Sequence, residues 1–113
     1  MKAMISQPMA GKTQAEIEYT RNEAIKFLNK LGYEVEDTYF GNEMHNKEFI
    51  KENGISSISL YYLAKSLEGM SKCDAVYFCS GWEEARGCRC EHGIAQAYGL
   101  KMLYEDYKEI YNV

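Results

Sequence analysis

The stretch "ISQPMAGKT", Ile5–Thr13, leads a short apolar strand into a loop that ends in Gly-Lys-Thr. Thr13 precedes Glu16 by three residues, which is the spacing of a capping box at the start of a helix. The loop does not fit a nucleoside-triphosphate loop, because that loop has a glycine six residues before its lysine, where this chain has Ser6. Pro8 also removes one backbone donor. The sequence therefore predicts a weak site for a single anion, because a loop of small residues joins a strand to the start of a helix.

The same alternation of strand and helix continues along the chain. Strands are expected at residues 2–6, 33–37, 74–80 and 101–104. Helices are expected after Thr13, around 47–52, after Ser57 and over 88–98. In the helix after Ser57, an inward face is expected from Leu60, Leu63, Ala64, Leu67 and Met70. The alternation implies right-handed crossovers and a parallel sheet. We expect one α/β domain over residues 1–113, with flavodoxin-like three-layer architecture, a sheet of about four to five strands and helices on both faces.

Composition narrows the classes of function. The chain has 113 residues, of which 46% are hydrophobic and 27% charged, an ordinary globular balance for one domain. Its net charge of −4 disfavours a nucleic-acid-binding surface. No apolar run is as long as a membrane span, and the first residues lack the apolar core of a signal peptide. A cytoplasmic protein is the expectation.

The four cysteines are expected to be reduced thiols. They are Cys73, Cys79, Cys88 and Cys90, and no pair has C-x-x-C spacing. Cys73 and Cys79 flank an apolar strand, where a free cysteine serves as a small core residue. A metal site from Cys88, Cys90 and His92 is a minor alternative. We therefore expect neither a metal nor an organic cofactor.

Candidate ligand-binding residues follow the expected strands, because ligands of open α/β sheets bind beyond the carboxyl ends of the strands. The loops at those ends are Gln7–Lys12, Gly81–Arg86 and the long polar segment Thr38–Ser56. Glu91 lies near the start of the third main helix, where the helix dipole would keep a carboxylate ionised, as a nucleophile must be. The alternative is that Glu91 only stabilises its helix and that the nearby arginines pair with other glutamates.

Three segments together resemble the nucleoside 2-deoxyribosyltransferase superfamily, and in particular its short, uncharacterised bacterial and phage branch (DUF4406-like). They are "ISQPMAGKT", "MSKCDAVYFCSGW" and "GCRCEHGIAQAYGLKM". The most specific of them has the pattern G-x-x-x-E-x-G-x-A-x-A-x-G, formed by Gly87, Glu91, Gly93, Ala95, Ala97 and Gly99. The resemblance spans about Lys2 to Tyr104.

The resemblance implies a reaction at the N-glycosidic bond of a nucleoside or nucleoside 5′-monophosphate. Glu91 would attack the anomeric carbon and form a glycosyl-enzyme, as in retaining glycosidases. Ser66 stands where the transferases carry an Asp that assists the leaving base, and Ala85 replaces a second Asp, six residues before Glu91. These differences leave three possibilities open: a nucleotide hydrolase, a transferase of altered specificity, or a protein that binds nucleotides without cleaving them.

The loop after the first strand would contact the sugar or its phosphate. The arginines would bind an anion, and an aromatic ring would stack on the base. The residues expected to bind the substrate are Gln7, Met9, Ala10, Gly11, Lys12, Tyr39, Trp82, Arg86, Gly87 and Arg89. For Trp82, packing at a contact between subunits is an equally weighted alternative. The resemblance also implies a homodimer or higher homo-oligomer, and the ten tyrosines exceed what one small core can bury.

Overall fold

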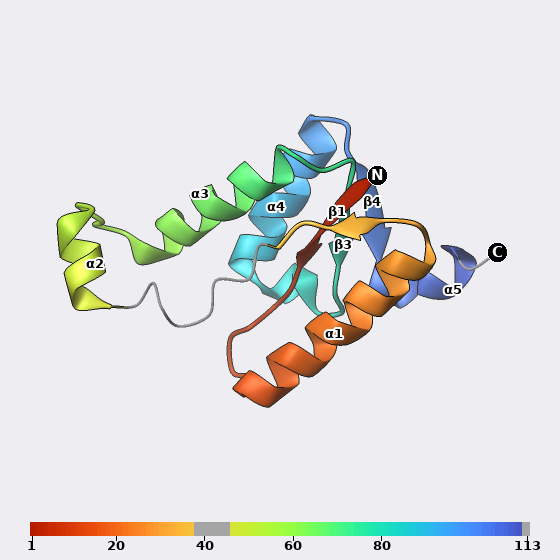
Figure 1. The fold of residues 1–113 in the computed structure, drawn as a ribbon, viewed down its shortest axis with the longest axis horizontal. Helices are drawn as coiled ribbons and strands as arrows, with labels where there is room; N and C mark the ends of the chain where they lie inside the picture. The colour runs from red at the N-terminus through yellow and green to blue at the C-terminus, as the bar shows by residue number, and fades with distance from the viewer. Residues whose placement is uncertain (38–45, 112–113) are drawn as a thin grey trace.

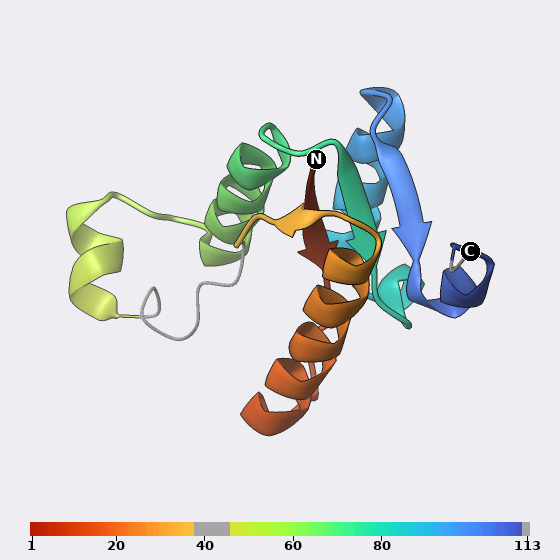
Figure 2. The ribbon, with the colours of Figure 1, turned by 45° about the vertical axis from the view of Figure 1, so that its right-hand side comes forward.

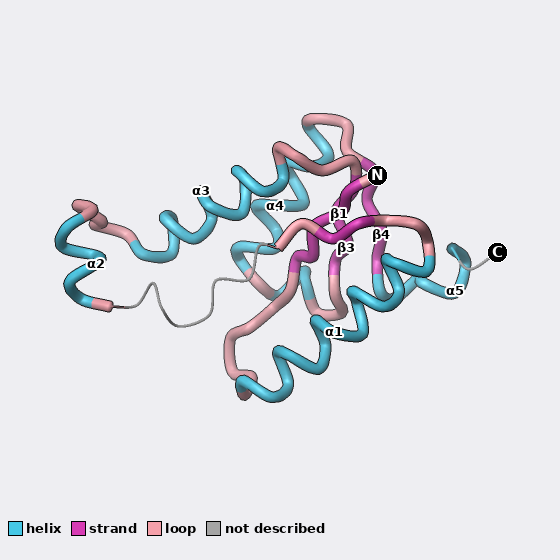
Figure 3. The backbone as a smooth tube through the Cα atoms, in the orientation of Figure 1, coloured by secondary structure: helices cyan, strands magenta, loops and turns pink. Residues whose placement is uncertain are grey.

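The computed structural model describes residues 1–37 and 46–111 (Figure 1). Its strands are β1 (Lys2–Ser6), β2 (Glu34–Val35), β3 (Ala75–Phe78) and β4 (Lys101–Tyr104). Its α-helices are α1 (Gln14–Lys30), α2 (Lys47–Glu52), α3 (Ile58–Met70), α4 (Arg86–Ala97) and α5 (Lys108–Tyr111). Figure 3 shows how strands and helices alternate along the chain. The predicted α/β architecture is confirmed, and the predicted bounds of β1, α2 and β4 are those observed.

The four strands form one parallel sheet in the order β2-β1-β3-β4. The chain leaves β1 toward β2 on one side and then crosses over to add β3 and β4 on the other. The order therefore reverses between β1 and β3, which is the place where flavodoxin-like sheets bind ligands. Ser6, the last residue of β1, is in register with Phe78, the last residue of β3. The two strands thus end level with each other at this switch point.

Successive side chains of the strands point to opposite faces of the sheet and form two apolar clusters. The face toward α1 buries Ala3, Ile5, Ala24, Leu28, Tyr33, Ala75, Tyr77, Cys79 and Leu103. The face toward α3 and α4 buries Met4, Met70, Cys73, Val76, Phe78 and Ala95. Figure 2 shows the helices on the two sides of the sheet. Cys73 and Cys79 are buried in these clusters, which confirms their predicted role as small core residues.

Helix α1 begins as its sequence predicts. Thr13 caps the helix by accepting a hydrogen bond from the backbone of Glu16, whose carboxylate accepts one from the backbone of Thr13 in return. Ser57 likewise caps α3 by accepting a hydrogen bond from the Leu60 backbone. These local signals fix where both helices start.

The predicted inward face of α3 is wrong over its first half. Only Gly69 and Met70 are buried, Leu63 and Leu67 are half-buried, and Leu60 is 62% exposed. A helix of 13 residues is about 20 Å long, whereas a strand of four residues covers only about 13 Å. The first turns of α3 therefore extend past the sheet, and α2 lies beyond them, far from the strands (Figure 1).

Other boundaries differ by one or a few residues. β2 and β3 are shorter than expected, and α4 begins at Arg86, two residues earlier than the predicted helix. In the described part of the chain, no helix combines the length and the apolar character that a bilayer crossing requires.

Candidate functional site

Glu91 is a buried carboxylate at the carboxyl end of the central strand β1. It lies on the buried face of α4 with Cys88 and Ala95, and it is 7% exposed. The hydroxyl of Ser6 donates a hydrogen bond of 2.8 Å to Glu91 Oε1. Ser6 is 1% exposed and ends β1. This contact places the carboxyl group of Glu91 at the switch point between β1 and β3.

Two further side chains belong to this cluster of polar groups. Ser66, half-buried on α3, stabilises the ionised form of Glu91 through a side-chain hydrogen bond that lowers the Glu91 pKa. Cys88 lies one helical turn before Glu91, and its thiol is a hydrogen-bond partner of Ser6. The structure therefore brings together Glu91 and Ser66, the two residues that the sequence predicted to act in catalysis.

The electrostatic setting of Glu91 differs from the predicted one. Burial is the largest influence and raises the pKa of Glu91 above its ordinary value of 4.5, while hydrogen bonds from Ser6 and Ser66 lower it. The sequence predicted that the helix dipole would keep Glu91 ionised. Because α4 begins at Arg86, Glu91 lies in the second turn, beyond the first turn over which a helix end acts, so the hydroxyl hydrogen bonds rather than the dipole favour its charged form.

No cation compensates the charge of Glu91 among the residues that the structure describes. Arg86 and Arg89 are exposed at the start of α4, and Arg89 donates a hydrogen bond of 2.9 Å to the carbonyl of Glu83. Both arginines therefore lie on the surface around the helix start rather than beside the carboxylate. Gly87 also lies there, with open space where a side chain would point, so a ligand has room to approach its backbone.

The loop after β1 has one buried end and one exposed end. Gln7 is 8% exposed and points to the face opposite Ser6, where its Nε2 donates a hydrogen bond of 2.7 Å to the Ile17 carbonyl of α1. Its Oε1 finds no partner in the described structure. The exposed part of the loop consists of Met9, Ala10, Gly11 and Lys12. Lys12 closes it with a hydrogen bond of 3.2 Å from its backbone to the Met9 carbonyl. Gln7 therefore anchors the loop to α1, while the tip is free to meet a ligand.

Trp82 packs against residues of its own chain. Its indole stacks on the His92 imidazole with 4.2 Å between ring centroids and 14° between planes, and it also contacts Phe78. His92 Nε2 lies 2.7 Å from the Tyr104 hydroxyl. The aromatic cluster therefore covers the β4 side of α4, whereas Glu91 faces β1. The structure gives Trp82 a packing role, and contact with a base stays a prediction. Tyr39 lies outside the described residues.

Two surface hollows lie on the α1 side of the molecule. The larger has a volume of about 510 Å³ and is bounded by α1 and the C-terminal segment. The smaller is lined by Lys12, Ala15, Glu16, Tyr19 and Thr20 at the start of α1. Neither is lined by Glu91, Ser6 or Ser66, so of the predicted binding residues only Lys12 borders one of them.

The described residues contain no group of three His, Cys, Asp or Glu side chains suited to a metal ion. Cys88 is buried, whereas Cys90 is exposed. Two residues apart on one helix, they point in different directions. The arrangement does not support the alternative of a metal bound by Cys88, Cys90 and His92.

The sequence model of the family described as "Domain of unknown function (DUF4406)" matches residues 1–104. The chain belongs to this family. No curated protein is significantly similar to it. The match covers every strand of this DUF4406 domain and the helix that carries Glu91. Because the family has no assigned activity, the chemistry must be argued from the site.

Sequence reasoning missed Ser6 and Cys88 as members of this site. One signal was present: Ser6 is a polar residue at the end of a strand that is otherwise buried, on the same face as Met4. Its partner Glu91 lies 85 positions away in the sequence, so only the assembled sheet of the DUF4406 domain identifies the contact.

Proposed function

We propose that the protein cleaves or transfers the N-glycosidic bond of a nucleoside or nucleoside 5′-monophosphate, with Glu91 as the nucleophile. The observation that carries this proposal is a buried carboxylate without a cationic partner, held by serine hydroxyls at the switch point of a parallel sheet. A buried charge of this kind costs stability, and such costs are concentrated at functional sites.

The chemistry needs a carboxylate that is ionised and held in place. One oxygen of Glu91 attacks C1′ of the sugar while the bond to the base breaks, and the electron pair of that bond leaves with the base. The negative charge stabilises the oxocarbenium-like transition state and then forms the glycosyl ester. Water or a second base next attacks C1′ while the ester bond breaks; the electron pair of that bond returns to the Glu91 carboxylate, and the proton that the attacking group loses neutralises the base anion released in the first step. Hydrogen bonds from Ser6 and Ser66 favour the ionised form before the attack and after this release.

Protonation of the leaving base is the weak point of the site. A serine hydroxyl is a much weaker acid than a carboxylic acid, and Ser66 stands where the transferases of the similar superfamily carry an Asp. Ser66 is also occupied in stabilising Glu91. We therefore expect slow turnover and a preference for bases that leave readily as anions or arrive already protonated.

The test is an intact-mass spectrum after brief exposure to 2-deoxyribonucleosides and their 5′-monophosphates, with chromatography of the free base released. A mass increase equal to the sugar or sugar phosphate, mapped to the peptide that carries Glu91, is the expected result. Neither adduct nor free base, across all common bases, would overturn the enzymatic proposal. If a nucleotide then raises the melting temperature without being cleaved, the protein is a nucleotide binder of the same fold.

The proposed assembly is at least a homodimer. Large apolar side chains remain exposed on several elements of the described chain: Leu60 is 62% exposed, Tyr98 81% and Ile110 73%. Exposed apolar side chains support an interaction surface when they gather in a patch. Light scattering on the purified protein tests this, and a monomer at all concentrations up to about 100 μM would contradict it.

A further inference from the structure

We propose that Ser6 is the positioning residue of Glu91, holding Oε1 so that Oε2 is the oxygen presented to the sugar. This inference deepens the proposed function and rests on it for its catalytic meaning. The geometric claim, that Ser6 fixes and ionises this carboxylate, is tested without any substrate.

Ser6 is suited to this role because its own position is fixed. It is the last residue of the central strand, 1% exposed, in register with Phe78, and its carbonyl accepts a hydrogen bond of 2.9 Å from the Cys79 backbone. Ser66 is held less firmly, since it is half-buried on α3, a helix whose first turns leave the sheet. Of the two hydroxyls, the one on β1 therefore sets the orientation of the carboxylate.

The donor and acceptor roles are also determined. A hydroxyl has one proton to donate, and an ionised carboxylate only accepts. The 2.8 Å contact is therefore a Ser6 hydroxyl donating to Glu91 Oε1 whenever Glu91 is charged. A hydrogen bond to the charged form favours that form, which opposes the effect of burial.

Cys88 completes the arrangement behind Ser6. Its thiol is buried, and burial raises the pKa of Cys88, so the sulfur keeps its proton at neutral pH. A side-chain hydrogen bond with Ser6 acts against burial and lowers the pKa of Cys88, so the thiol is a neighbour of the Ser6 hydroxyl. The negative charge of Glu91 also raises the pKa of Cys88, so it opposes ionisation of the thiol.

The experiment compares Ser6→Ala with Ser6→Cys, a close match in volume but a weaker donor, and with the control Ser71→Ala. Ser71 is an exposed residue at the C-terminal cap of α3, and its substitution removes a hydroxyl hydrogen bond to the Glu68 carbonyl. The pKa of Glu91 is read directly from the pH dependence of its ¹³C carboxyl resonance. We expect this pKa to rise in Ser6→Ala, to rise less in Ser6→Cys and to stay unchanged in Ser71→Ala.

If the wild-type protein releases base, Ser6→Ala should lower kcat by roughly 10- to 100-fold with little change in KM, which is the range for one hydrogen bond to a charged group. The acidic limb of its pH profile should move to higher pH. An unchanged Glu91 pKa in a folded Ser6→Ala or Ser6→Cys variant overturns the inference. A raised pKa in a protein that never cleaves a nucleotide would instead refute only the proposed function.

Discussion

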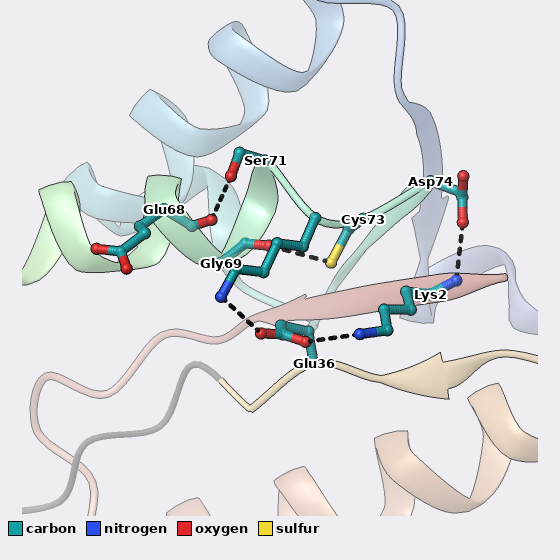
Figure 4. A network of polar contacts seen from close by, with 8 residues as sticks. Lys2, Glu36, Glu68, Gly69, Ser71, Cys73 and Asp74 are labelled. Carbon is teal, nitrogen blue, oxygen red and sulfur yellow. Dashed lines mark hydrogen bonds and ion pairs between the residues drawn. The ribbon is translucent and has the colours of Figure 1, made fainter.

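Two carboxylates near opposite ends of strand β1 have opposite surroundings: one is paired with lysines and the other is not. Glu36 lies between two lysines. Its carboxylate is 3.6 Å from Lys2 Nζ (Figure 4) and, on the other side, 3.9 Å from Lys72 Nζ. Its side chain is 21% exposed. Glu91 is more deeply buried, at 7% exposure, and its partners among the described residues are hydroxyls.

The difference is the one expected between a carboxylate that stabilises the fold and one that acts as the proposed nucleophile. The charged groups around Glu36 tie β2 to the start of β1 and to the turn before β3, where the Lys2 backbone also donates to the Asp74 carboxylate (Figure 4). Opposite charges offset much of the cost of taking Glu36 out of water. Within residues 1–37 and 46–111 no ion pair is formed by Glu91, although the chain has 13 lysines and arginines. A carboxylate that only stabilised the fold would gain from such a partner, whereas a nucleophile would be neutralised by it.

The largest effect on the rate of base release is expected from removing the charge of Glu91, compared with removing that of Glu36. Glu91→Gln keeps the volume of the side chain but cannot form the glycosyl ester, so the rate of base release should fall on the order of 10³-fold or more. Glu36→Gln is the matched control and should leave the rate within about twofold, because Glu36 lies outside the site. Chromatographic assays on both variants check this, and equal losses in the two would erase the distinction between the carboxylates.

A second carboxylate beside Glu91 should sharpen the comparison. In Ser66→Asp, two acids share one buried position without a cation, which disfavours the charged form of both. We expect the free energy of unfolding to fall by roughly 2 kcal/mol at pH 7 and to recover as the pH is lowered toward 5, where one carboxyl takes a proton. Urea denaturation at the two pH values measures the change. A variant as stable as the wild-type protein at pH 7 would mean that Ser66 does not face Glu91.

The sequence contained the local signals of the fold but not its long-range contacts. Thr13 and Glu16 lie three residues apart, so their capping box was predictable and is present. The exposed first half of α3 was not predictable from periodicity, because an apolar helix face does not reveal where the strands beneath it end. The hydrogen bond between Ser6 and Glu91 joins residues 85 positions apart, and α4 starts two residues earlier than predicted. A boundary error of that size weakens an argument based on the helix dipole, whose influence ends within the first turn.

The pH dependence of stability should distinguish Glu91 from an ordinary carboxylate. Its folded pKa is raised above the unfolded value of 4.5, so the folded protein holds a proton that the unfolded chain has already lost. The stability from this proton is fully present below the unfolded pKa and is lost as the pH rises through the folded one. Because glutamine does not titrate, Glu91→Gln should gain stability relative to the wild-type protein as the pH rises from 4 to 8. Thermal melts of both proteins across that range test the sign, and a Glu91→Gln variant that loses stability relative to the wild-type protein as the pH rises would contradict a raised pKa.

The smallest effect is expected at the lysines around Glu36. Their side chains are 41% and 57% exposed, and ion pairs of that exposure contribute at most about 0.5 kcal/mol, less in salt. Lys72→Met keeps the aliphatic stem and removes the charge, so the free energy of unfolding should change by no more than that amount, and the difference should vanish at 1 M NaCl. Lys65→Met removes a comparable exposed pair with Glu68 on α3 and serves as the control for a general effect of charge. A loss of several kcal/mol at Lys72 alone, insensitive to salt, would show that Glu36 depends on its cations as strongly as a buried charge does. In that case both carboxylates would reduce stability strongly when uncompensated, and the lack of a cation at Glu91 would no longer distinguish Glu91 from Glu36.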